Sequence, residues 1–170
     1  MKKNIVLSIA ILVGSVVLDQ ITKVWAVREL ADHSIPLFFS WLSFRLTINY
    51  GGAFSMQSGN NVMFFIVTIV GLPLFVWWLI SSLKKSALAC VSLSMIIGGT
   101  IGNAIDRALL GTGFFNGGVR DFIAVDWFAT FNVADCFLTI GMGLFLLELL
   151  FLGPDALIRS KKEKKENESE

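Results

Sequence analysis

Four apolar runs, each close to the length of a membrane-spanning helix, are the strongest constraint that this sequence places on its fold. They are Ile5–Val27, Val62–Leu83, Ser86–Ile105 and Val133–Leu152. A helix needs about 20 apolar residues to cross the hydrocarbon layer of a bilayer. Of the 170 residues, 55% are hydrophobic, which is more than the surface of a soluble domain of this size can accommodate. We therefore predict an all-α membrane protein with four transmembrane helices.

The basic residues predict how these helices are oriented. Lys and Arg concentrate in the cytoplasmic loops of membrane proteins. Nine of the 14 basic residues fall on one side of the predicted spans, at Lys2, Lys3, Lys84, Lys85, Arg159, Lys161, Lys162, Lys164 and Lys165. We therefore predict that both termini are cytoplasmic, that residues 1–158 form one membrane domain, and that residues 159–170 are a charged, disordered tail.

The two outer loops carry signals of their own. Between Phe44 and Tyr50 apolar and polar residues alternate, and this period of two predicts a strand with one apolar and one polar face. The following segment, Gly51–Ser58, is expected to be a short apolar element at the membrane surface. The second loop, Gly111–Phe131, mixes glycines with aromatic residues, which favours strands or an interfacial element. The sequence thus predicts a small β-containing region on the outer side.

The acidic residues gather at one depth, close to the outer boundary of the membrane. Ionisable groups at this depth cost about 2.5–3.5 kcal/mol or more each, so they usually face an interior cavity and mark function. On the inner side we expect Glu148 to be alone and to snorkel toward water. The five acids on the outer side are Asp19, Asp106, Asp121, Asp126 and Asp135.

Two groups of these residues also have a purely structural explanation. Asp19 and Lys23 are one helical turn apart, a spacing that favours an ion pair. Asn103 and Asp106 share a helix face, with Arg107 next to them, and these polar side chains are expected to tie off a helix end. Gly98 and Gly102 have the small-xxx-small spacing of closely packed membrane helices, and they lie just before these polar residues.

The start of the last apolar run also admits two interpretations. Asn132 and Asp135 have the spacing of a capping box, in which the acid is stabilised by the helix dipole. A catalytic role for Asp135 is equally compatible with that position. Asp121 follows a glycine-rich turn where no local signal requires an acid, and Asp126, beside Trp127, lacks a local reason as well. Spacing alone leaves the choice between these two aspartates open.

Other chemistries find little support in the sequence. His33 is the only histidine, and it lies in an outer loop. No CxxC motif or Cys/His cluster is present, so we predict neither a metal site nor a cofactor. The net charge of +1 argues against nucleic acid as a partner. Two other classes remain as alternatives: a transporter or proton pathway, which should carry polar residues through the whole membrane, and an assembly factor whose aspartates only cap and pair helices.

At these positions the chain resembles the lipoprotein signal peptidase (signal peptidase II) family over nearly its whole length. The resemblance rests on several motifs in the same order. They are Asp19-Gln20 with Lys23; Asn49, Gly51, Ala53 and Phe54; Gly102-Asn103, Asp106 and Arg107; Val119, Asp121 and Phe122; and Phe131-Asn132, Ala134 and Asp135. One departure is Cys136, where serine or another small residue is expected, and its similar size makes the change of little consequence.

The resemblance implies an aspartic endopeptidase whose catalytic residues are Asp121 and Asp135, and so it selects Asp121 over Asp126. Such an enzyme removes signal peptides from bacterial prolipoproteins, just before the diacylglyceryl-modified cysteine, in the cytoplasmic membrane near its outer face. Membrane lipid and inhibitors such as globomycin are the other expected partners. Substrate-binding or supporting roles are implied for Asp19, Lys23, Asn49, Gly51, Ala53, Phe54, Asn103, Asp106, Arg107, Asn132 and Ala134.

Two further hypotheses concern how such a site works. Two carboxyl groups close together cannot both ionise cheaply, so one keeps a proton and the pair titrates as a unit. Because a helix N-terminus favours negative charge, we expect Asp135 to be ionised and Asp121 to hold the proton. The segment around Phe54 is expected to clamp the substrate over the site.

Overall fold

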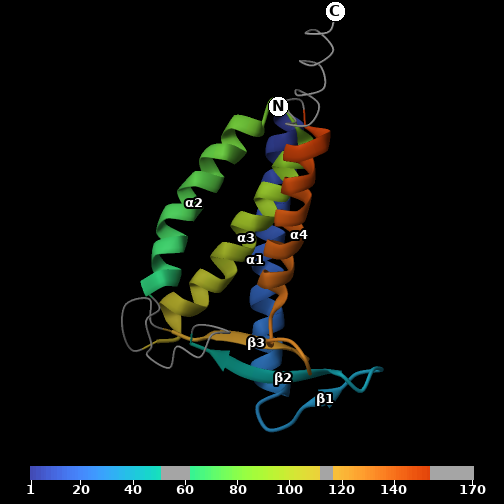
Figure 1. Cartoon of the computed structure of the whole chain (residues 1–170). Coiled ribbons are helices and arrows are strands. Elements are labelled where there is room, and N and C mark those ends of the chain that lie inside the picture. The colour runs from blue at the N-terminus through green and yellow to red at the C-terminus, as the bar shows by residue number, and fades with distance from the viewer. Residues whose placement is uncertain (51–61, 112–116, 154–170) are drawn as a thin grey trace, which may run out of the picture.

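The computed structural model describes residues 1–50, 62–111 and 117–153, with the backbone alone at 62–65 and 67. In this part of the chain, four long helices make up the body of the molecule (Figure 1). They are α1 (Lys2–Glu29), α2 (Val62–Ser82), α3 (Ala87–Leu109) and α4 (Val133–Leu147), the last continued by a π-helix, η1 (Glu148–Leu152). The helices predicted from the four apolar runs are therefore present, with somewhat different ends.

Three of the described helical segments are long and apolar enough to cross a membrane: Lys2–Glu29, Ala87–Leu109 and Val133–Leu152. For α2 the apolar stretch with described side chains, Thr68–Ser82, is shorter than a membrane span. The fourth span therefore stays a prediction. We expected Asp106 to lie just beyond the third span. It lies inside α3, because this helix continues to Leu109. Its carboxylate is bound by Arg120.

Helix α3 is the centre of the bundle and packs against α1 and α4 (Figure 1). Its glycines allow this close approach. A Cβ atom at Gly98 would lie 2.7 Å from Cβ of Ser15, and one at Gly102 would lie 2.5 Å from Oδ2 of Asp19. The close helix contact predicted from the spacing of these two glycines is thus confirmed. Its consequence is that the Asp19 carboxylate lies directly against α3.

A small antiparallel sheet lies across one end of the helices (Figure 1). Within the described residues its strands are β1 (Ile35–Pro36), β2 (Leu42–Asn49) and β3 (Val119–Val125), in the order β1-β2-β3. Strands in both predicted outer loops are therefore confirmed. The predicted apolar element Gly51–Ser58 lies outside the described residues.

Strand β2 departs from the predicted alternation of faces. Its pairing with β3 shifts between Phe44 and Thr47, where β2 contains one residue more than β3. Beyond this bulge Ile48 and Tyr50 are 41% and 59% exposed, whereas Asn49 is half-buried. The predicted continuous apolar face is wrong past the bulge, because one extra residue exchanges the two faces of a strand.

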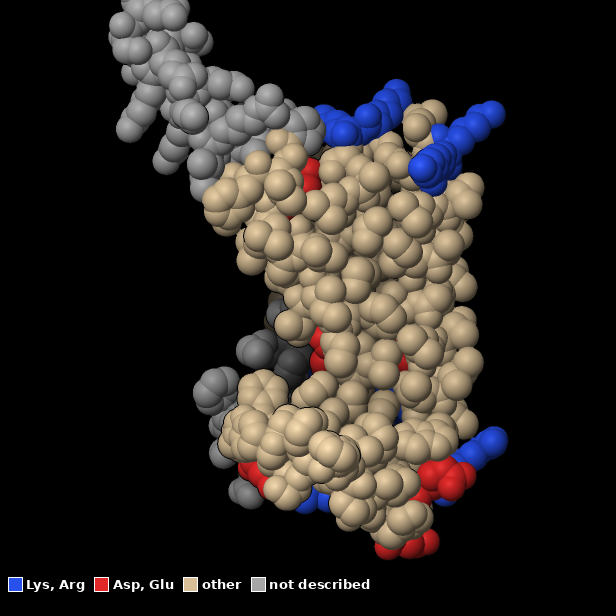
Figure 2. All heavy atoms as spheres, turned by 90° about the vertical axis from the view of Figure 1, so that its right-hand side faces the viewer, with Lys and Arg blue, Asp and Glu red and all other residues tan. Residues whose placement is uncertain are grey.

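The two ends of the bundle differ in their charged residues. The start of α1, the turn between α2 and α3 and the end of α4 lie at the end away from the sheet (Figure 1), where the side-chain amide of Asn4 donates to the carbonyl of Leu83 at 3.0 Å. On the face shown in Figure 2, Lys and Arg gather at this end, charges of both signs gather at the sheet end, and uncharged residues cover the middle. This distribution suits a membrane protein. Which end is cytoplasmic stays a prediction, as do the limits of the predicted tail.

Candidate active site

Asp121 and Asp135 are brought together at the sheet end by a single asparagine. Asp121 lies in the middle of β3, and Asp135 lies in the first turn of α4. The side-chain amide of Asn132 donates to Oδ1 of Asp121 at 2.6 Å, and the backbone N–H of Asn132 donates to Oδ2 of Asp135 at 3.1 Å. The two carboxyl groups therefore share one neighbour, and their charges interact.

The start of α4 has the predicted capping box. The side-chain oxygen of Asn132 accepts from the backbone N–H of Asp135 at 3.1 Å, and the Asp135 carboxylate returns a bond to the backbone of Asn132. This arrangement satisfies helix N–H groups that would otherwise lack partners. The cap does not prevent Asn132 and Asp135 from belonging to the site, because the side-chain amide of Asn132 also donates to Asp121. The capping interpretation and the site interpretation are thus compatible.

A second asparagine, Asn103 of α3, holds Asp135 from the other side. Its side-chain amide donates to Oδ1 of Asp135 at 2.8 Å. Its side-chain oxygen accepts from Lys23 Nζ at 2.8 Å and from the Asn132 amide at 3.1 Å. With donors on both sides of its oxygen, the Asn103 amide has one favourable orientation, and this fixes the position of the Asp135 carboxylate.

The predicted ion pair between Asp19 and Lys23 is confirmed. Lys23 Nζ lies 2.9 Å from Oδ2 of Asp19 and 3.5 Å from Oδ2 of Asp106, and the side chains of all three residues are fully buried. The Asp19 carboxylate has a further role, since its Oδ1 accepts from the backbone N–H of Ala134 at 2.9 Å. This bond ties α1 to the residue that immediately precedes Asp135. The ion pair therefore also positions the start of α4.

The sequence interpretation missed Arg120. Its guanidinium binds both oxygens of Asp106, with Nη2 2.6 Å from Oδ1 and Nε 3.1 Å from Oδ2. Its backbone N–H also donates to Asp106 at 2.9 Å, and Nη2 donates to Gln20 Oε1 at 3.0 Å. Charge balance could have suggested it, because Lys23 alone cannot neutralise both Asp19 and Asp106. Arg120 fixes β3 to α3 at the residue next to Asp121.

Asn49 completes the surroundings of Asp121. Its side-chain amide donates to Oδ2 of Asp121 at 2.9 Å. The bulge in β2 makes this contact possible, because it places Asn49 opposite Val119. Residues two apart on a strand share a face, so Asn49 and Asp121 lie on the same side of the sheet. Without the extra residue, Asn49 would be directed to the opposite side.

The electrostatics of the site distinguish Asp121 from an ordinary aspartic acid. Its side chain is 2% exposed, and its pKa is raised to about 6. Burial is the largest cause of this rise and the charge of Asp135 adds to it, whereas hydrogen bonds from Asn49 and Asn132 act in the opposite direction. Arg107 of α3 is also buried, and its charge interacts with those of Asp121 and Asp135. The arrangement provides one carboxyl group that holds a proton near pH 6, which is suited to general acid–base chemistry.

The remaining predicted residues divide into two groups. Asp126 lies on the exposed turn after β3, where its backbone N–H donates to the carbonyl of Trp41, and no contact in the described chain joins it to the site. Gly51, Ala53 and Phe54 lie outside the described residues.

Among residues 1–50, 62–111 and 117–153, no three His, Cys, Asp or Glu side chains are grouped so that they could hold a metal ion.

Comparisons with known proteins agree on one family. The model of the family described as signal peptidase (SPase) II matches residues 10–151. The lipoprotein signal peptidase of Staphylococcus carnosus (strain TM300) is 39% identical over 161 residues, covering 89% of this chain and 96% of the relative. That of Caldicellulosiruptor bescii is 38% identical over 152 residues, covering 89% and 96%, and that of Acinetobacter baumannii (strain ATCC 17978) is 37% identical over 147 residues, covering 81% and 80%.

A solved structure agrees with these relatives. It is described as a bacterial membrane enzyme determined by the in meso method at 1.9 Å resolution, and it is 34% identical to this chain. The two superimpose with a TM-score of 0.69 over 85% of this chain and 92% of that one. The family model spans the helices and strands that form the site, the relatives and the solved structure agree with it, and we conclude that the chain belongs to the signal peptidase II family.

Proposed function

We propose that this chain is an aspartic endopeptidase of the bacterial cytoplasmic membrane. It removes signal peptides from prolipoproteins by cutting just before the diacylglyceryl-modified cysteine. The class of substrate comes from the relatives, which are named lipoprotein signal peptidase. One observation carries the assignment of the site: Asn132 binds both Asp121 and Asp135. The pKa of Asp121, raised to about 6, agrees with this assignment.

The two carboxyl groups take different roles in this proposal. Burial favours the neutral form of Asp121. Asp135 accepts hydrogen bonds from Asn132 and Asn103 in the first turn of α4, where the helix dipole stabilises negative charge. Asp135 therefore removes a proton from the attacking water. Asp121 donates its proton to the oxygen of the scissile carbonyl as the tetrahedral intermediate forms.

The place of the site in the fold suits a membrane-bound substrate. The carboxyl groups lie where the helices meet the sheet, so a peptide that emerges from an apolar signal helix reaches them while its acyl chains stay in lipid. Polar donors surround the reacting groups, and we expect Asn49 and Arg107 to orient the substrate backbone. The same groups are the expected binding site of globomycin. The clamp proposed for Phe54 concerns residues outside those described, and the variant Phe54→Ala should weaken substrate affinity or turnover.

The direct test uses the purified full chain in detergent or lipid with two forms of one prolipoprotein. One form carries the diacylglyceryl group on its cysteine and the other does not. Mass spectrometry of the products identifies the bond that is cut. Cleavage of the modified form immediately before the cysteine is the expected result. Absence of cleavage, or a cut at another bond, would contradict the proposed function.

The assignment of the proton can be tested separately. Carboxyl ¹³C NMR or infrared spectroscopy of the free enzyme, with Asp121→Asn and Asp135→Asn to identify the signals, reports which group ionises first. We expect Asp135 to be ionised while Asp121 is still protonated. The reverse order would overturn the assigned roles without affecting the identity of the pair.

A further inference from the structure

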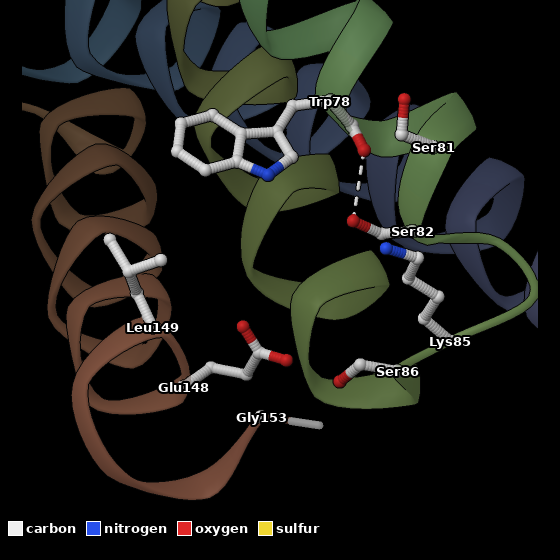
Figure 3. A pocket seen from close by; sticks show the side chains of 8 residues that line it. All are labelled: Trp78, Ser81, Ser82, Lys85, Ser86, Glu148, Leu149 and Gly153. Atoms are coloured by element: carbon white, nitrogen blue, oxygen red, sulfur yellow. Dashed lines mark hydrogen bonds between the residues drawn. The ribbon is translucent and has the colours of Figure 1, made fainter. Parts of the chain in front are cut away.

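A pocket at the end of the bundle away from the sheet contains a buried carboxylate that is separate from those of the candidate active site. This pocket, which we call the Glu148 pocket, has a volume of about 90 Å³ and lies where the end of α2, the start of α3 and η1 meet (Figure 3). Neither Asp121 nor Asp135 contributes to it. The lining residues that matter for its chemistry are Ser81, Ser82, Lys85, Ser86, Glu148 and Gly153.

Glu148 is more deeply buried than the sequence analysis predicted. Its side chain was expected to snorkel toward water, but the residue is only 8% exposed, and the carboxylate is directed into the pocket (Figure 3). Within the described residues, no hydrogen bond or ion pair is made by this carboxylate. Leaving a buried charge or hydrogen-bond acceptor without a partner is costly. The carboxylate is therefore available to a cationic group that enters the pocket.

The backbone is shaped around this carboxylate. Glu148 begins the π-helix η1, and the N–H of Gly153 closes the wide turn by donating to the carbonyl of Glu148 at 2.7 Å. A Cβ atom at Gly153 would lie 2.6 Å from Oε1 of Glu148. Any other residue at 153 would therefore displace the carboxylate.

The serines around Glu148 present acceptors. The hydroxyl of Ser82 donates to the carbonyl of Trp78 at 2.9 Å, and that of Ser81 donates to the carbonyl of Trp77 at 2.9 Å. Each hydroxyl has a single hydrogen, so these oxygens have only lone pairs left for a ligand. Together with the two oxygens of Glu148 they suit a group with several N–H donors, such as a primary ammonium. A trimethylammonium group has no N–H to offer.

The opposite side of the pocket suits an anion. Lys85 contributes a positive charge, and the Ser86 hydroxyl accepts from the backbone N–H of Ala89 at 3.1 Å, which leaves its own hydrogen available to donate. Lys84 and Lys85 mark this end of the helices as the level of the lipid headgroups. A ligand found at this level that carries an ammonium and a phosphate a few bonds apart is a phospholipid.

We propose that the Glu148 pocket binds the phosphoethanolamine headgroup of a membrane phospholipid. The ammonium binds Glu148 and the Ser82 oxygen, and the phosphate lies near Lys85 and Ser86. The inference does not depend on the proposed peptidase function, because it concerns the other end of the bundle and is tested without measuring cleavage.

The test compares lipids that differ only in the headgroup. The purified full chain is titrated in detergent with phosphatidylethanolamine, phosphatidylcholine and phosphatidylglycerol of the same acyl chains, and bound lipid is counted by native mass spectrometry. We expect phosphatidylethanolamine to bind about tenfold more tightly than phosphatidylcholine, as expected when a charge-assisted hydrogen bond is lost. In Glu148→Gln this preference should disappear. Glu29→Gln, the same change at the exposed end of α1 beside the sheet, is the matched control and should retain it.

A second variant and a competition experiment test the same binding site. Gly153→Ala leaves both charges in place but moves the carboxylate, and it should also reduce the preference for phosphatidylethanolamine. Soluble phosphoethanolamine should compete with the lipid in the wild type and not in Glu148→Gln, which identifies the headgroup as the bound part. Equal binding of phosphatidylethanolamine and phosphatidylcholine by the wild type, or an unchanged preference in Glu148→Gln, would overturn the proposal. Binding of phosphatidylglycerol that equals that of phosphatidylethanolamine would show attraction of anions alone and would overturn it as well.

Discussion

The two ends of the bundle both contain buried charges, but they satisfy them in different ways. At the sheet end, Asp19, Lys23 and Asp106 are fully buried and bound to one another, and Arg120 binds Asp106 in addition. At the other end, the Glu148 carboxylate is almost as deeply buried and makes no bond to any described residue. These three charged groups at the sheet end are bound by described protein groups, whereas the Glu148 carboxylate is open to a group that enters its pocket.

This difference shows what each end is suited to do. A buried ion pair rarely adds stability over apolar residues of the same size, but losing one partner is very costly, so such a network strongly favours one arrangement of its side chains. That property is useful where two carboxyl groups must be held at fixed positions. A buried charge without a protein partner is instead suited to bind a ligand of opposite charge. Four measurements test this difference between the two ends.

The largest effect is expected at the two carboxyl groups that the network holds. Asp121→Asn and Asp135→Asn should each lower kcat for a diacylglyceryl-modified prolipoprotein by about 10³-fold or more, because general acid–base catalysis typically contributes 10²–10⁴-fold. Asp126→Asn is the matched control, since Asp126 is exposed on the next turn of the chain, and it should retain activity. Full activity in either Asp121→Asn or Asp135→Asn, with folding verified, would show that the altered carboxyl group does not take part in the reaction.

The next largest effect concerns stability and contrasts the two ends directly. Lys23→Met leaves Asp19 and Asp106 short of a counter-charge and should lower the free energy of unfolding by about 3–5 kcal/mol. Glu148→Gln, measured in detergent without added lipid, removes a charge that has no partner among the described residues and should not destabilise the protein. Thermal unfolding of the two variants and the wild type under identical conditions measures this contrast. Equal losses of stability would show that the two ends do not differ as described.

A smaller effect is expected at Arg120, a positioning residue that acts through Asp106 and the backbone next to Asp121. Arg120→Ala should lower kcat about ten- to a hundredfold, with less change in KM, since small displacements of a reacting group have effects of this size. Arg120→Lys should restore only part of the loss, because lysine cannot bind both oxygens of Asp106 in the same way. A purely structural role would instead lower stability while leaving kcat of the folded fraction unchanged.

The smallest effect is a shift in the pH dependence. The pKa of Asp121 is about 6, so the group is protonated below that pH and loses its proton as the pH rises through it. The plot of kcat/KM against pH should therefore fall above about pH 6. The raised pKa favours the folded state most at low pH, and this contribution to stability is lost as the pH rises from the ordinary value of 3.8 to about 6. The hydrogen bond from Asn49 lowers this pKa, so Asn49→Leu should move the descending limb to higher pH. If the descending limb of kcat/KM lies at the same pH in Asn49→Leu as in the wild type, Asp121 is excluded as the titrating acid.

Much of the fold could be predicted because the signals are local. The apolar runs predicted helices at all four places, and the ion pair of Asp19 with Lys23 and the cap formed by Asn132 and Asp135 were evident from spacing within one helical turn. The bulge in β2 was not predicted, because it depends on how β2 pairs with β3. Arg120 was missed for the same reason, since its partners Asp106 and Gln20 lie 14 and 100 residues away in the sequence.

Local sequence features are enough to predict that apolar helices fill most of this chain and that several carboxyl groups lie near the ends of those helices, because length, periodicity and spacing act over a few residues. That Asp121 joins Asp135 through Asn132, and that Asp126 does not, became evident from the folded structure. The folded structure also directs Glu148 into a pocket and not toward water. These outcomes depend on which helix and strand pack together, and packing between distant segments leaves no local pattern in the sequence.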